Sequence, residues 1–238
     1  MDIRRRFFAA WAISFLWRKN AIKMGSRYSH YFFQFSFAST ATTIVSGAVA
    51  ERMRLHSYMM FSFLNILVYC IPASWCWATN GWLRRLEFFD FAGVCVVHLN
   101  GGASALVATM LLGPRLNRFQ FPDRYAMSSP GPLGLHANAL LGFNSSTWDG
   151  SSGSQCLVAV TTLNGGIGGG QTGLDPHKIT IKQGKINVDY IINSILGSLV
   201  SVTGVCAVTS PVEAIIIGAI GGTISIGGTN RLEHLRIR

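Results

Sequence analysis

The sequence predicts an all-α protein, a polytopic bundle of transmembrane helices, from three observations. Charged residues make up only 13% of the 238 residues, while hydrophobic residues make up 49%. The few charges gather in short blocks, so long uncharged windows separate them. Because a bilayer core about 30 Å thick needs ~20 helical residues to cross it, most of these windows are long enough to span a membrane.

The uncharged windows are taken as seven candidate spans. Residues 57–78 and 190–209 have the length and apolar content of full spans, whereas 132–148 and 155–173 are thinned by Gly, Ser, Asn and Pro. The thinned spans are expected to be buried among other helices, since irregular backbone facing lipid leaves peptide groups unsatisfied. A Gly-rich soluble protein with buried helices is the alternative. The windows run 28–50, 57–83, 91–114, 125–148, 150–174, 190–212 and 214–230.

Glycine is the small residue that lets membrane helices approach closely, and the chain has 26 of them. Residues 168–173, GGGQTG, also fit the G-x-G-x-x-G pattern of nucleotide-binding loops. No β-strand is predicted before them and they lie in a candidate span. We therefore predict that they serve close helix packing.

The net charge of +10 raises the possibility of nucleic-acid binding, but the placement of the charges indicates membrane topology. Alternate loops carry eleven basic residues on one side and only Arg84 and Arg85 on the other, as expected of cytoplasmic and outer loops. No nucleic-acid partner is predicted, and the C-terminus is expected in the cytoplasm. The eleven are Arg52, Arg54, Arg115, Arg118, Arg124, Lys178, Lys182, Lys185, Arg231, Arg236 and Arg238.

The N-terminal segment breaks this pattern, because its seven basic residues fall on the predicted outer side. Its apolar run, Phe7–Trp17, is too short to cross a bilayer. We predict a separate basic segment over residues 1–30 and a transmembrane domain over residues 31–238.

Enzyme chemistry and metal binding find little support in the sequence. The five cysteines all lie in candidate spans without metal-type spacing, so they are interpreted as small buried apolar residues. Paired carboxylates and nucleophile motifs are lacking as well. No enzyme activity, metal or cofactor is predicted.

Three consecutive segments carry a resemblance to a known family. They are FFQFSFASTATTIVSGAVAERMR (32–54), SWCWATNGWL (74–83) and DFAGVCVVHLNGGASALVATMLLGPR (90–115). Together they resemble the ammonium transporter family (Amt/Mep/Rh), nearest its Amt branch, and the third is the most specific. LGFNSS (141–146) and LGSLVSVTGVCAVTSPVEAIIIGAIGG (196–222) are similar to later parts of the family's pattern.

The resemblance implies a bundle of eleven helices built from two inverted halves and assembled as a homotrimer with one pore per subunit. The seven candidate spans would correspond to helices three through nine, so the chain is expected to be incomplete at both ends. The implied function is transport of ammonium or ammonia across the lipid bilayer through a hydrophobic pore. The membrane is expected to be the plasma membrane. The alternative is a nonconducting truncated member or membrane subunit.

The resemblance also assigns site residues. Phe37, Trp77 and Asp90 would recruit the cation at the outer side, Phe37 and Phe143 would form a stacked gate, and His98 would line the pore. Residue by residue, the alternatives are packing or interface-belt roles for the aromatic residues and helix capping for Asp90. Asp90 stands eight residues before His98, which predicts about two helical turns between them on one face. The family's second pore histidine is not matched; His136 and His234 do not carry its motif.

Overall fold

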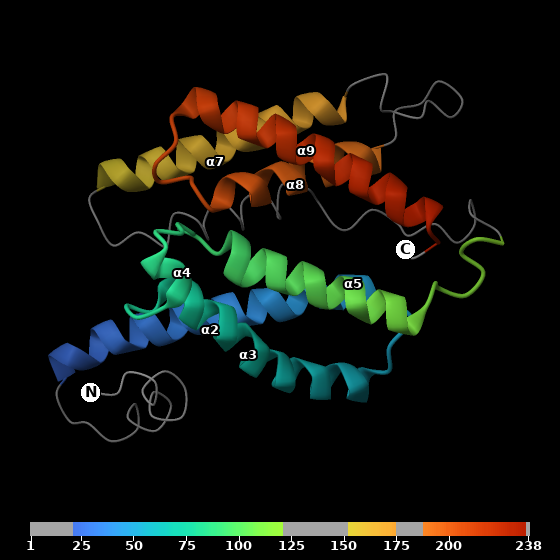
Figure 1. Cartoon of the computed structure of the whole chain (residues 1–238), viewed down its shortest axis with the longest axis horizontal. Coiled ribbons are helices and arrows are strands. Elements are labelled where there is room, and N and C mark those ends of the chain that lie inside the picture. Colours follow the sequence, from blue (N-terminus) through green and yellow to red (C-terminus); the bar gives the residue numbers. More distant parts are fainter. Residues whose placement is uncertain (1–20, 121–151, 175–187, 237–238) are drawn as a thin grey trace.

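The computed structural model describes residues 21–120, 152–174 and 188–236, and within these ranges every regular element is a helix (Figure 1). The predicted all-α class is confirmed. Six of the seven uncharged windows contain a helix, while the window 125–148, with Phe143, lies outside the described residues. The elements are α2 (Ala21–Val49), α3 (Leu55–Trp77), α4 (Trp82–Arg85), η1 (Val94–Leu99), α5 (Asn100–Leu112), α7 (Ser152–Gly173), α8 (Val188–Thr203) and α9 (Pro211–His234).

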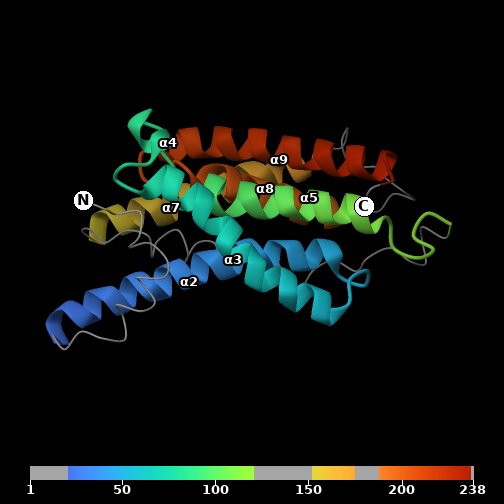
Figure 2. The same cartoon turned by 60° about the horizontal axis from the view of Figure 1, so that its bottom comes forward.

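The helices pack as two groups that follow the order of the chain. Helices α2, α3 and α5 pack with η1 in the first group, and α7, α8 and α9 form the second (Figures 1 and 2). Contacts between η1 and α8 join the groups. Because η1 contains His98, the candidate site lies where the two groups meet.

Three of the described helical stretches are long and apolar enough to cross a membrane: Leu55–Arg85, Val94–Leu112 and Pro211–His234. The apolar helix Val188–Thr203 is shorter. Helix α2 begins at Ala21, inside the basic segment assigned to residues 1–30. The domain boundary at residue 30 stays a prediction.

Helices α7, α8 and α9 approach closely at glycines, which confirms the packing role predicted for residues 168–173. A Cβ atom added to Gly168 would collide with the backbone oxygen of Ile215 on α9, and one added to Gly169 would collide with Ser198 Oγ on α8. Gly218 on α9 lies directly against the backbone carbonyl of Gly165 on α7. Only residues without a side chain allow these backbones to touch.

Replacing Gly218 with alanine is expected to destabilise the protein by about 1–3 kcal/mol, because the new methyl group meets rigid backbone on α7. Gly228 on the same helix is the matched control, since a Cβ there meets no atom within 4 Å. Thermal unfolding of the two alanine variants in detergent measures the difference. Equal melting temperatures would contradict the packing argument.

The start of α9 explains the single charge that separates the windows 190–212 and 214–230. Ser210 Oγ accepts a hydrogen bond from the backbone N–H of Glu213 at 3.4 Å, and the Glu213 carboxylate accepts one from the N–H of Ser210 at 2.7 Å. Pro211 occupies the first turn. This reciprocal capping satisfies two of the helix's free donors and fixes where α9 begins.

All five cysteines are free thiols. Cys76 and Cys206 are buried, and Cys70 and Cys95 are half-buried. The prediction of small buried residues is wrong for Cys156, which is exposed near the start of α7.

The segment after α5, residues 113–120, also contacts the second group of helices. Arg118 Nη2 lies 3.2 Å from Glu233 Oε1 on α9. The guanidinium of Arg236 lies over the ring of Phe119, 5.9 Å from its centroid. Both groups are therefore linked at the end where α5 and α9 finish.

Candidate functional site

The carboxylate of Asp90 caps the start of η1. Its Oδ1 accepts hydrogen bonds from the backbone N–H groups of Gly93 and Val94, each at 2.8 Å. Its Oδ2 accepts from Cys95 at 2.8 Å and from Val96 at 3.2 Å. Asp90 is only 6% exposed, and its carboxylate satisfies four backbone donors, two buried and two half-buried, at the positive end of the helix. This is the capping role; a part in cation recruitment stays a prediction.

The predicted spacing of two α-helical turns between Asp90 and His98 is wrong. The helix begins only at Val94, after Asp90, and Val94–Leu99 is a π-helix in which the His98 N–H donates to the Gly93 oxygen at 3.2 Å. A π-turn holds an extra residue, and such turns are frequent at functional sites. The fixed cap and the widened turn together set the direction of the His98 side chain.

Gly93 makes the turn into η1 possible. Its φ of 90° lies in the left-handed region that glycine adopts without strain. A Cβ at this position would come within 2.9 Å of Val97 Cγ2 and 3.2 Å of Phe37 Cε1. The glycine therefore lets the ring of Phe37 on α2 lie directly against the start of η1.

Phe33, Phe37 and Trp77 form an aromatic cluster between α2 and α3. The ring centroids of Phe37 and Trp77 are 5.6 Å apart in an edge-to-face arrangement, and those of Phe33 and Phe37 are 4.1 Å apart. Phe37 is buried, with 1% exposed, and Trp77 is half-buried. Phe33 was missed by the sequence reasoning, although its spacing of four residues from Phe37 places both on one helix face.

The Asp90 segment also fixes the orientation of Trp77. The indole Nε1–H donates to the backbone oxygen of Asp90 at 2.8 Å. The same segment is held from the other group of helices, because the Phe91 N–H donates to the Gly204 oxygen at 3.0 Å. A Cβ on Gly204 would meet Val94 Cγ1 at 2.6 Å, so the end of α8 lies close against η1.

His98 carries a buried polar atom without a partner. Its Nε2 is inaccessible and has no hydrogen-bond partner within the part of the chain that the structure describes. The same holds for Nδ2 of Asn100, two residues on, which the sequence reasoning also missed. Buried polar atoms are almost always hydrogen-bonded, so each exception suggests a ligand or water that completes it.

The structure thus brings together four of the five predicted site residues, while the fifth lies outside the described residues. Phe37 and Trp77 are in ring contact, Asp90 holds Trp77 through its backbone, and Asp90 caps the helix that carries His98. Phe143 is not among the described residues, so its gate with Phe37 stays a prediction. Aromatic faces attract cations, and an unpaired imidazole nitrogen offers a hydrogen bond without a fixed charge.

These features define a multi-pass helical membrane protein with polar groups buried along a spanning helix, as transporters and channels have. Comparison with known sequences then gives the family. A sequence model of the Ammonium Transporter Family matches residues 4–238, and the chain belongs to that family.

Curated relatives and solved structures agree with this assignment. The chain is 38% identical to the putative ammonium transporter 3 of Caenorhabditis elegans, over 92% of the chain and 33% of that protein. It is 37% identical to ammonium transporter 3 of Dictyostelium discoideum, over 84% of the chain and 49% of that protein. The chain spans about a third to a half of these relatives' lengths.

Among solved structures, a sensor Amt protein superposes with a TM-score of 0.77 at 28% identity, covering 100% of this chain and 59% of that one. Mep2 of Candida albicans gives a TM-score of 0.70 at 26% identity, covering 84% and 45%. The predicted helical bundle of the ammonium transporter type is confirmed.

Proposed function

We propose that this chain forms part of an ammonium pore in which the aromatic cluster draws the cation in and His98 hydrogen-bonds the ammonium or ammonia that passes through the apolar interior. The observation that carries the proposal is the buried, unpartnered Nε2 of His98, on the helix capped by Asp90. The same Asp90 segment accepts the hydrogen bond that orients Trp77. The Asp90 segment would therefore fix the position of Trp77 at the entrance relative to His98 in the interior.

The chemistry of ammonium suits this arrangement. Moving a bare cation from water into a medium of low dielectric costs roughly tens of kcal/mol in an idealised calculation. Ammonium differs from a metal cation because it can release a proton and cross as neutral ammonia. A neutral imidazole can accept or donate a hydrogen bond during that passage, with no fixed charge to trap the ion.

The assembly and placement proposed for the chain rest on the family and on the loop charges. Membership in the ammonium transporter family supports a homotrimer with one pore per subunit, a plasma-membrane location and a gate between Phe37 and Phe143. The excess of Lys and Arg on one set of loops supports a cytoplasmic C-terminus.

The test of transport is growth of a yeast strain without its own ammonium transporters on limiting ammonium. Two proteins are compared: the chain itself, and a chimera in which the chain replaces the matching part of a complete relative. Rescue by the chain supports transport by the chain as it stands. Rescue by the chimera alone means that the residues are competent but need further helices. A chimera that reaches the plasma membrane and fails to rescue would overturn the proposal.

Changing Trp77 to leucine is expected to raise the ammonium concentration for half-maximal uptake by about 2–30-fold, since one aromatic face contributes ~0.5–2 kcal/mol to cation attraction. Trp77→Phe is the matched variant, because it keeps an aromatic face and loses the hydrogen bond to Asp90. The half-maximal concentration of Trp77→Phe should lie between those of the unmodified protein and Trp77→Leu. Uptake of labelled ammonium over a range of concentrations gives the values, and an unchanged half-maximal concentration in both variants would argue against recruitment at Trp77.

A further inference from the structure

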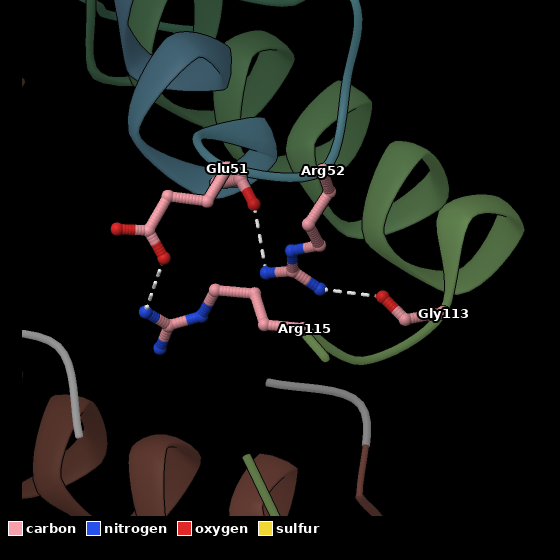
Figure 3. Close-up of polar contacts among 5 residues, drawn as sticks. Glu51, Arg52, Gly113 and Arg115 are labelled. Atoms are coloured by element: carbon pink, nitrogen blue, oxygen red, sulfur yellow. Dashed lines mark hydrogen bonds and ion pairs between the residues drawn. The ribbon is translucent and has the colours of Figure 1, made fainter. Parts of the chain in front are cut away.

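Two arginines lie close together at the end of the bundle where α2 and α5 finish. Arg52 follows α2 and donates from Nη1 to the Gly113 oxygen and from Nη2 to the Ala48 oxygen, each at 2.8 Å. Figure 3 shows its guanidinium beside that of Arg115, which follows α5. The first arginine thus joins the ends of two helices, and the second lies next to it.

Arg115 is buried and weakly paired. Its side chain is only 8% exposed, and Nη1 lies 3.4 Å from Oε2 of Glu51, whose own side chain is 70% exposed. Charge-assisted hydrogen bonds between such groups are typically about 2.7–2.9 Å long. The single carboxylate therefore compensates the buried charge poorly.

The positive charges of Arg52 and Arg115 outnumber the single negative charge of Glu51 beside them. Nε of Arg52 and Nε of Arg115 are both buried without a hydrogen-bond partner in the described part of the chain. Burial, followed by the nearby charge of Arg115, lowers the pKa of the Arg52 guanidinium. Two neighbouring cations with free donors and one solvent-facing carboxylate are the arrangement that a further anion would stabilise.

We propose that Arg52 and Arg115 form a binding site for a phosphate-bearing anion. Guanidinium groups match the tetrahedral oxygens of phosphate through several parallel hydrogen bonds. The helix Val94–Leu112, which ends just before the site, is long and apolar enough to cross the membrane. The site therefore lies at the level of lipid headgroups, where basic groups between helices bind anionic lipids. Free phosphate has the same chemistry, and the experiment separates the two sources.

Lipid binding to the purified full chain in detergent tests the site. Native mass spectrometry compares an anionic phosphatidylglycerol, a zwitterionic phosphatidylcholine and inorganic phosphate. Phosphatidylglycerol should bind the unmodified chain more tightly than phosphatidylcholine, and Arg115→Gln should weaken it by about fivefold. Arg54→Gln is the matched control: Arg54 is exposed in the same loop and caps α3 through its backbone, so its removal should leave this binding within twofold, roughly, of the unmodified chain.

Glu51→Gln is a second variant for which the proposal predicts a gain of lipid binding, a result that misfolding would not produce. Glu51 is exposed and competes with the anion for Arg115, so its neutralisation should strengthen phosphatidylglycerol binding. Displacement of the lipid by inorganic phosphate at millimolar concentration would assign the site to free phosphate. Equal binding of both lipids with no effect of phosphate would overturn the proposal. So would equal losses in Arg115→Gln and Arg54→Gln, or weaker binding in Glu51→Gln.

Discussion

Replacing His98 with phenylalanine is expected to lower ammonium uptake roughly 10–100-fold while leaving the folded protein at least as stable as before. A donor or acceptor left without its hydrogen-bond partner in the apolar interior costs about 1–3 kcal/mol, and adding this cost to the barrier for passage has this effect on rate. Stability should not fall, because Nε2 of His98 makes no hydrogen bond in the described structure and phenylalanine fills a similar volume. Uptake is measured in whichever protein supports growth, the chain or the chimera, and stability by thermal unfolding.

His98→Gln is the control for this prediction, since an amide can also donate and accept hydrogen bonds. It should keep more uptake than His98→Phe at equal expression. If the phenylalanine variant transports as well as the unmodified protein, His98 does not line the pore. If it unfolds at a much lower temperature, the imidazole has a structural role that the geometry does not reveal.

Asp90→Ala is expected to destabilise the protein by about 3 kcal/mol or more and to remove most of the folded yield. The change leaves the N–H groups of Gly93, Val94, Cys95 and Val96 without their acceptor, and each buried unpaired donor costs about 1–3 kcal/mol. The loss is below the full sum because water can reach part of a loosened turn. Size-exclusion profiles and thermal unfolding in detergent measure it.

Asp90→Asn separates capping from cation recruitment. The amide oxygen can still accept from two of the four donors, so the variant should lose about half as much stability as Asp90→Ala. If capping is the main role, uptake per folded molecule should largely survive in Asp90→Asn. A folded Asp90→Asn protein with uptake reduced more than tenfold would instead favour direct electrostatic recruitment.

The charge pattern marks the start of α3, because Arg54 directly precedes its first residue, Leu55. The predicted span 57–78 contains nearly all of this helix, which ends at Trp77. The prediction was less accurate for residues 190–212, because α8 ends at Thr203. The reason is a tertiary contact: the Gly204 oxygen accepts from Phe91, and the glycine lies against Val94. Charge patterns carry no information about such contacts.

The site shows the same division between local and tertiary information. Capping by Asp90 was one of two roles open from the sequence, because an acidic residue before an apolar run is a local signal. The π-turn at Val94–Leu99 was not predicted, since it depends on how η1 packs between Phe37 on one side and Gly204 on the other. Phe33 and Asn100 lie outside the positions that the family resemblance assigns to the site. The ring contact of Phe33 with Phe37 and the unpartnered Nδ2 of Asn100 in the described residues are properties of the three-dimensional structure.

The π-turn makes chain length itself a determinant of the chemistry. Removing one residue between Val94 and Leu99 would allow the segment to wind as an ordinary α-helix, and each residue of such a helix turns the next by about 100°. The imidazole would then swing away from its present direction while every side chain in the sequence except one was retained. Ammonium uptake should therefore survive conservative replacement of the valines between Val94 and Leu99 far better than the deletion of any one residue from this segment.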